Sequence, residues 1–319
     1  MTDLAPEPTS QSWKRVLRRI YGVALVVAAI VVLALRRDDV AALVEGARPA
    51  PLLAALALSL ASLAQSAWFW SRGLTDLRSP LPFPKVLEAT VAAIPGRYLP
   101  GSIWYAAGRI GALRGAGAST AALGVVAVLE TLLSFVVAVA LGAGLLVAGG
   151  TADTGLGIAS LGVVAVALCL VSSPWVLNPV VRWVGARRGL GEVPVVGWSG
   201  YVELVGHLVL FWVVSAAAFW CYLAAFPAVD APGVVRTAGT FLVSWAAGFV
   251  AVFAPQGAGV FETTMAGLLE GPVAALALVV AGYRALTAVR DALALLALAA
   301  ARGRLPRAIE PPAGSDAGR

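Results

Sequence analysis

The sequence has 319 residues, of which 60% are hydrophobic and only 13% are charged. A water-soluble globular domain carries charge on about a quarter of its residues, so this composition excludes that class and predicts a protein that spans a membrane. The net charge of +6 agrees with basic cytoplasmic loops and with attraction to anionic lipid head groups. Because the chain has no platform of aromatic and basic residues, we expect no nucleic-acid partner.

Apolar stretches of about 20 residues, the length that crosses a bilayer, recur along the chain. We expect a disordered cytoplasmic N-terminus (1–12), a single transmembrane domain (13–301) and a disordered cytoplasmic tail (302–319). The basic segment 178–200 is expected to be a loop, and the last span is either continuous or divided near Arg290. Six stretches are expected to cross fully: 16–35, 49–70, 121–147, 156–177, 202–226 and 272–301.

The segment from Ile94 to Gly117 interrupts this pattern, because it contains two prolines, six glycines and three arginines. Proline cannot donate a helix hydrogen bond, and glycine loosens a helix. Helix breaks are therefore predicted at two dipeptides, Pro95-Gly96 and Pro100-Gly101. Broken backbone within a membrane persists only where protein buries it or a water-filled cavity solvates it. Together with Arg97 and Arg109, these breaks predict the wall of a polar cavity.

A second interrupted segment runs from Phe253 to Thr264. Its break is predicted at Pro255, Gly257 and Gly259, and the carboxylate of Glu262 follows. Interrupted segments in both halves of a membrane protein are a sequence feature that points to a transport site. We therefore expect the two segments to meet near the middle of the membrane and to enclose a pocket.

The distribution of basic residues tests this layout. With a cytoplasmic N-terminus and both interrupted segments as re-entrant hairpins, 17 of the 23 Lys and Arg lie on the cytoplasmic side and 4 lie outside, as the positive-inside rule predicts. We therefore expect an all-α polytopic protein of the plasma (inner) membrane, with six spans, two re-entrant broken-helix hairpins and both termini in the cytoplasm. Hairpins that enter from opposite sides are typical of an inverted repeat. Seven or eight full spans are the alternative, if either hairpin crosses completely.

Ionisable side chains within apolar stretches are costly and need partners. Glu130, well inside its helix, has two interpretations: a structural ion pair with an arginine of the first interrupted segment, or a gate at the cavity. Glu262 is expected to stabilise a helix start and to pair with Arg284. Arg290 and Asp291 are neighbours in sequence, so we expect them to point apart and either to find partners elsewhere or to lie at the membrane interface.

His207 is the single histidine, and we interpret it as a structural hydrogen-bonding residue. Cys169 and Cys221 lie in apolar runs, and free cysteine behaves there as a small hydrophobic residue. Because no CxxC motif or Cys/His cluster is present, we expect no metal and no other cofactor.

Three motifs resemble one known family: YLPGSIWYAAGR (Tyr98–Arg109), LRGAGASTAALGVVAVLE (Leu113–Glu130) and APQGAGVFE (Ala254–Glu262). They are similar to the transmembrane flippase domain of bacterial lysylphosphatidylglycerol synthases, the multiple peptide resistance factor family, and of its stand-alone relatives. The resemblance covers essentially the whole chain. It implies a membrane protein that moves a phospholipid or a polyprenyl-phosphate-linked lipid between leaflets. The chain differs at Thr131 and Phe261, where the family often has arginine. It is expected to lack the soluble aminoacyl-transferase domain.

We therefore expect a lipid flippase rather than an enzyme, with an anionic membrane lipid and a separate lipid-modifying enzyme as partners. The expected substrate-binding residues are Arg97, Arg109, Glu130, Glu262 and Arg284. Arg97 and Arg109 would neutralise a head-group phosphate. Glu130 and Glu262 would hold these arginines, or receive a cationic group, between loaded states. The sequence has no P-loop motif for nucleotide hydrolysis. We therefore expect a gradient or downhill exchange to drive the movement of the lipid. Two alternatives are an integral-membrane transferase acting on a lipid-linked substrate and a non-transporting membrane partner of a separate enzyme.

Overall fold

The computed structural model describes residues 45–99, 103–150, 172–187, 193–227, 233–251, 259–269 and 273–304, with single residues (41, 163, 170, 229 and 257) between them. In these ranges the chain is helical and contains no strand. The elements are α3 (Pro49–Asp76), α4 (Phe83–Ala92), the 3₁₀ turn η1 (Ile94–Tyr98), α5 (Ile103–Gly115), α6 (Thr120–Ala148), α8 (Pro174–Arg187), α9 (Trp198–Ala224), α10 (Val234–Val250), α11 (Val260–Leu269) and α12 (Val273–Arg304).

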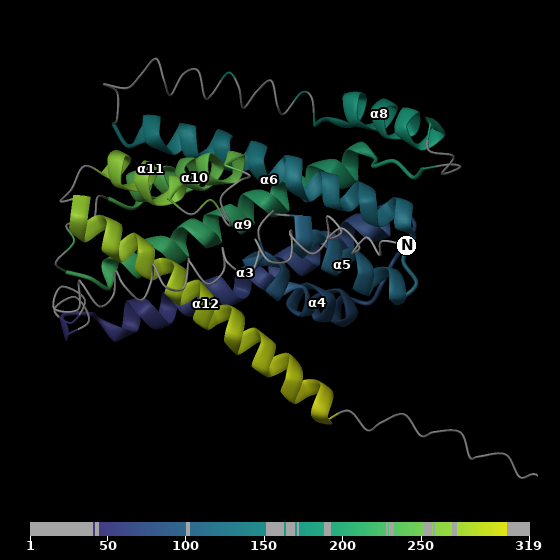
Figure 1. The fold of residues 1–319 in the computed structure, drawn as a ribbon. Helices are drawn as coiled ribbons and strands as arrows, with labels where there is room; N and C mark the ends of the chain where they lie inside the picture. The colour runs from purple at the N-terminus through teal and green to yellow at the C-terminus, as the bar shows by residue number, and fades with distance from the viewer. Residues whose placement is uncertain are drawn as a thin grey trace, which may run out of the picture.

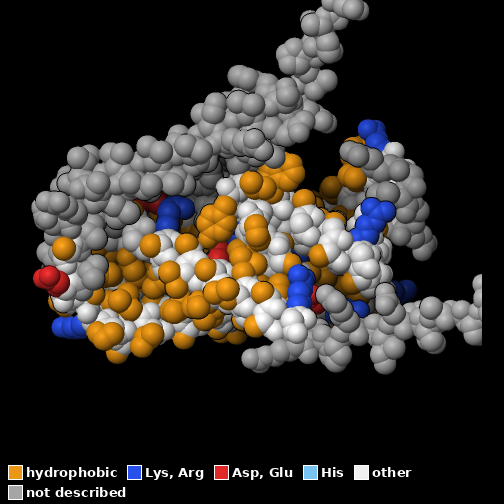
Figure 2. Space-filling model, turned by 60° about the horizontal axis from the view of Figure 1, so that its bottom comes forward, with side chains coloured by type: hydrophobic (Ala, Val, Ile, Leu, Met, Phe, Trp, Pro, Cys, Tyr) orange, Lys and Arg blue, Asp and Glu red, His pale blue; other side chains and the backbone are white. Residues whose placement is uncertain are grey.

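Among the residues that the structure describes, three helices are long and apolar enough to cross a membrane: α3, α6 and α9. They form the centre of the bundle, where α9 packs on α3 and α6 packs on α10 (Figure 1). Figure 2 shows that hydrophobic side chains cover most of the coloured surface of one face, with charged side chains in small separate groups. The described residues are all helical, as predicted, and their long apolar helices are compatible with a helical membrane protein. The helices expected at 49–70, 121–147 and 202–226 are confirmed.

Other boundaries differ from the sequence-based expectation or fall outside the described residues. The expected span 16–35 and most of the expected span 156–177 lie outside the described ranges. So do the expected disordered N-terminus and the expected disordered tail, except residues 302–304, which belong to α12. Part of the expected loop 178–200 is helical, because α8 continues to Arg187 with Pro179 inside it; this proline removes one hydrogen bond without ending the helix. α12 is continuous for 32 residues to Arg304, so it does not divide near Arg290.

The first interrupted segment forms a helical hairpin. α4 ends at Ala92, a 3₁₀ turn with Pro95 near its start follows, and α5 begins at Ile103 and packs back against α4. The turn is tight, because a Cβ on Gly96 would lie 2.7 Å from the carbonyl oxygen of Trp104. The break at Pro95-Gly96 is confirmed, whereas Pro100 and Gly101 lie outside the described residues.

The second interrupted segment also folds back on itself. α10 ends at Val250, α11 begins at Val260, and the two helices pack against each other. Gly257 has φ +67°, and a Cβ there would lie 2.5 Å from the Cα of Gly248, so only glycine fits this position. Gly259 has φ +87°. The break is confirmed at these two glycines, and Pro255 lies outside the described residues.

The expectation that the two hairpins meet is wrong for the described residues. α4, η1 and α5 pack on α3, α6 and α12, whereas α10 and α11 pack on α6, α9 and α12. In Figure 1 the first hairpin lies to the right and the second to the left. Two helices, α6 and α12, contact both hairpins, whereas no packing of one hairpin on the other is found among these elements.

An aromatic cluster fixes the first half of α12. Phe219 of α9 packs on Phe241, Phe261 and Tyr283, which come from α10, α11 and α12. Tyr222 of α9 donates a hydrogen bond of 2.7 Å to the carbonyl oxygen of Val279 on α12. These contacts join four helices at the end of the bundle that holds the second hairpin.

Close packing of α6 on α10 depends on glycine. A Cβ on Gly239 would lie 2.9 Å from the backbone nitrogen of Leu146 and 3.0 Å from the carbonyl oxygen of Gly142. Gly239→Ala is therefore expected to lower the thermal stability of the purified protein, since overpacking costs about 1–3 kcal/mol. Gly144→Ala on α6 is the control, because nothing lies within 4 Å of its Cβ position. Equal melting temperatures for the two variants would contradict this account.

Candidate functional site

Arg109 of α5 lies at the centre of a buried polar network. Its side chain is fully buried, and its Nη1 lies 3.0 Å from Oε1 of Glu130 on α6. Glu130 also accepts hydrogen bonds from the hydroxyl of Ser66 (2.9 Å) and the indole N–H of Trp70 (2.7 Å), both on α3. Arg109 donates in addition to the hydroxyls of Ser66 and Tyr105. The interpretation of Glu130 as the partner of an arginine in the first hairpin is confirmed.

This network leaves Arg109 without a surface for a ligand. Its charge is balanced by one carboxylate, and its guanidinium lies 4.7 Å from the ring of Trp70 and 4.4 Å from that of Tyr105. A head-group phosphate would have to displace Glu130 to reach it. The structure therefore gives Arg109 the role of fixing α5 to α3 and α6.

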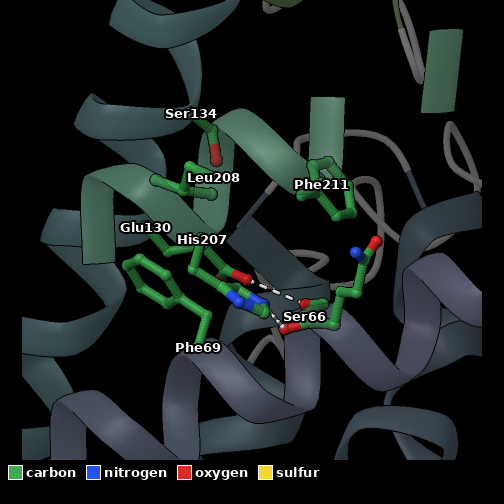
Figure 3. A pocket seen from close by; sticks show the side chains of 8 residues that line it. Ser66, Phe69, Glu130, Ser134, His207, Leu208 and Phe211 are labelled. Carbon is green, nitrogen blue, oxygen red and sulfur yellow. Dashed lines mark hydrogen bonds between the residues drawn. The ribbon is translucent and has the colours of Figure 1, made fainter. Parts of the chain in front are cut away.

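A small pocket opens beside Glu130 (Figure 3). It lies between α3, α6 and α9 and is lined by Gln65, Ser66, Phe69, Glu130, Ser134, His207, Leu208 and Phe211. The space open to the centre of a water molecule is about 20 Å³, room for on the order of one or two waters. His207 makes a 2.9 Å hydrogen bond with the carbonyl oxygen of Gln65 and stacks on Trp68, in agreement with a structural role. The pocket is too small for a lipid head group.

A second charged cluster joins η1 to α12. Asp291 of α12 accepts a hydrogen bond from the hydroxyl of Tyr98 at its Oδ2 (3.0 Å). Its Oδ1 lies 2.7 Å from Nη2 of Arg290 and 3.9 Å from Nη1 of Arg97. The expectation that Arg290 and Asp291 point apart is wrong, because the long Arg290 side chain bends back so that its Nε also donates to Asp291 (2.8 Å).

Tyr105 lies between the two networks. The guanidinium carbon of Arg97 lies 4.1 Å from the centre of its ring, and that of Arg109 lies 4.4 Å from the same centre. Attraction between a cation and an aromatic face is worth about 0.5–2 kcal/mol, depending on burial. The ring therefore links the buried Arg109 network to the partly exposed Arg97 cluster.

The third charged pair belongs to the second hairpin. Arg284 of α12 forms an ion pair with Oε1 of Glu262 on α11. Oε2 of Glu262 accepts a hydrogen bond of 2.7 Å from the backbone N–H of Gly259, which satisfies a donor at the start of α11. Both expectations for Glu262, the helix start and the pairing with Arg284, are confirmed.

One face of α12 therefore connects to both hairpins. Arg284 and Asp291 are seven residues apart, about two helical turns, and they bind the second and the first hairpin respectively. Sequence reasoning placed Arg284 among the substrate-binding residues, whereas it treated Asp291 only as a charged residue that needs a partner. The signal available was an Arg-Asp dipeptide inside an otherwise apolar helix.

Comparisons with known proteins do not identify the chain: no family model and no curated protein matches it. The resemblance to the flippase domains thus rests on the three motifs alone. Within the described ranges, no three His, Cys, Asp or Glu side chains are grouped so that they could hold a metal ion.

Proposed function

We propose that the protein is a lipid transporter of the plasma membrane, which moves a phospholipid or a polyprenyl-phosphate-linked lipid between leaflets. One observation carries the proposal: the broken helix of the first hairpin presents Arg97 and Tyr98 at the edge of an apolar bundle. The Arg97 side chain is 24% exposed, and Tyr98 is 49% exposed. An arginine beside a broken helix is suited to bind a head-group phosphate, while the acyl chains stay on the apolar surface.

The other charged residues would support this site rather than bind the lipid themselves. Arg109 and Glu130 hold α5 in place, and Tyr105 transmits that order to Arg97. Glu262 and Arg284 hold the second hairpin against α12. The lipid class itself is inferred from the motif resemblance described above.

The proposal is tested by transport of fluorescent phosphatidylglycerol in reconstituted vesicles, measured as the rate at which a membrane-impermeant reductant bleaches inner-leaflet lipid. Arg97→Ala is expected to slow transport about ten-fold, because it removes a charged contact to the phosphate. Arg114→Ala is the control, since Arg114 lies on the same hairpin, is exposed and carries the same charge. Variants are compared only after size-exclusion chromatography shows a folded protein.

Three outcomes would overturn the proposal. Wild-type rates in both Arg97→Ala and Glu130→Ala would remove these residues from the function. Formation of a modified lipid by the purified protein would favour a membrane transferase. Co-purification of a lipid-modifying enzyme, with Arg97 dispensable, would favour a non-transporting partner.

A further inference from the structure

We infer that Arg97, Tyr98 and Arg290 form a phosphate-binding site, and that Asp291 occupies the place of the phosphate until a ligand arrives. The inference deepens the proposed function and rests on it for the lipid that carries the phosphate. The site lies where the first hairpin meets α12.

Donors converge on Asp291 from two elements. From η1, the Tyr98 hydroxyl binds Oδ2 at 3.0 Å, and Nη1 of Arg97 lies 3.9 Å from Oδ1. From α12, Nε and Nη2 of Arg290 lie 2.8 and 2.7 Å from the same Oδ1. Two guanidinium groups and a hydroxyl are the donors that phosphate oxygens also bind, and arginine matches phosphate with two parallel hydrogen bonds.

The charges at this cluster differ from those of the other two networks. Arg109 with Glu130, and Arg284 with Glu262, each combine one cation with one anion. Arg97 and Arg290 both pair with Asp291, so this cluster brings two guanidinium groups to one carboxylate.

The arrangement of exposed surface favours a lipid over a free ion. Asp291 is only 3% exposed, whereas Tyr98, which binds it, is 49% exposed. Leu99 and Ile103, which follow in the chain, are 38% and 67% exposed. A phosphate at Arg97 would thus have apolar side chains beside it on which an acyl chain can lie.

Binding in this site is an exchange of partners with no covalent change. Phosphate oxygens take over the hydrogen bonds of Arg290 and Tyr98 and the ion pair of Arg97, and Asp291 is left as an adjacent like charge. Like charges placed together oppose binding, so Asp291 holds affinity for the anion down. Asp291 therefore competes with the phosphate for the same donors, and it keeps those donors ordered when no phosphate is bound.

The test is titration of the full-length protein in detergent with dioctanoyl phosphatidylglycerol, followed by microscale thermophoresis. Asp291→Asn is expected to lower Kd about ten-fold, because the competing charge is removed while the hydrogen-bonding shape is kept. Glu88→Gln is the matched control, since it changes the net charge equally at the exposed pair with Arg302, and its Kd should equal that of the wild type.

Further titrations identify the ligand. Tyr98 is half-exposed, so Tyr98→Phe is expected to fold. It should raise Kd several-fold, because one hydrogen bond to the phosphate is lost. Dioctanoylglycerol, which lacks the phosphate, is expected not to bind. Sodium phosphate that binds as tightly as the lipid would overturn the assignment to a lipid.

An unchanged or raised Kd in Asp291→Asn, with Tyr98→Phe equal to the wild type, would overturn the inference and leave the cluster as a structural contact. This result is separable from failure of transport. If the predicted Kd changes occur but Arg97→Ala transports at the wild-type rate, the phosphate site stands and the transport proposal fails.

Discussion

Replacing Glu130 with glutamine is expected to destabilise the protein by about 3–5 kcal/mol, the usual effect of removing one partner of a buried ion pair. Arg109 is fully buried between α3, α5 and α6, and Glu130 is its anionic partner. Without the carboxylate its charge has no counterion at hydrogen-bonding distance among the described residues. The measurement is unfolding in mixed micelles of increasing dodecyl sulfate content, followed by circular dichroism.

The double variant Arg109→Met/Glu130→Gln is expected to recover most of this loss, because a buried ion pair exchanged for apolar or neutral groups is frequently close to neutral in stability. Glu88→Gln, in an exposed pair with Arg302, serves as the control and should change stability by about 1 kcal/mol or less. If the double variant is as unstable as Glu130→Gln alone, the lost stability comes from the hydrogen bonds of Ser66 and Trp70 and not from the uncompensated charge.

Gly96→Ala is expected to prevent α5 from packing back against α4. The first hairpin should then fail to fold, and lipid transport should be lost. A Cβ at this position would lie 2.7 Å from the carbonyl oxygen and 2.8 Å from the backbone nitrogen of the residues that begin α5, Trp104 and Tyr105. Backbone cannot rotate out of the way as a side chain can, so α5 would have to move as a whole. The expected loss exceeds the roughly 1–3 kcal/mol of ordinary overpacking.

Gly111→Ala on the same hairpin is the matched control. Nothing lies within 4 Å of its Cβ position, and alanine favours a helix over glycine by about 1 kcal/mol. This variant should be as stable as the wild type or slightly more so, with an unchanged transport rate. Normal transport by Gly96→Ala would show that the turn does not need the observed geometry.

The helices and breaks were predictable because local chemistry decides them. Long apolar runs fold as helices wherever a membrane surrounds them, and the Pro95-Gly96 dipeptide ends α4 whatever lies nearby. The two carboxylates Glu130 and Glu262 also indicated partners, since each lies where a bare charge is costly. Their pairing with an arginine of the first hairpin and with Arg284 follows from this need.

What the sequence could not supply depends on tertiary packing. The relative position of the two hairpins is set by how α3, α6, α9 and α10 pack, and the sequence gives no direct measure of that. Arginine side chains are long and flexible, so helical geometry alone did not predict the bond between Arg290 and its neighbour Asp291. Similarly, nothing local distinguishes Arg109, which is buried, from Arg97, which is partly exposed.

The contacts that fix α12 lie closer to one of its charged residues than to the other. The aromatic cluster packs α12 tightly near Gly282, where a Cβ would lie 2.4 Å from the hydroxyl of Tyr222, so a tilt of the helix would turn about this point. Asp291 lies about 13 Å further along the helix, whereas Arg284 lies about 3 Å away. A tilt of about 15° thus displaces Asp291 by roughly 3.5 Å, but Arg284 by less than about 1 Å. Such a tilt separates Asp291 from Tyr98 while the Glu262–Arg284 pair stays closed, so the two hairpins respond differently to one motion.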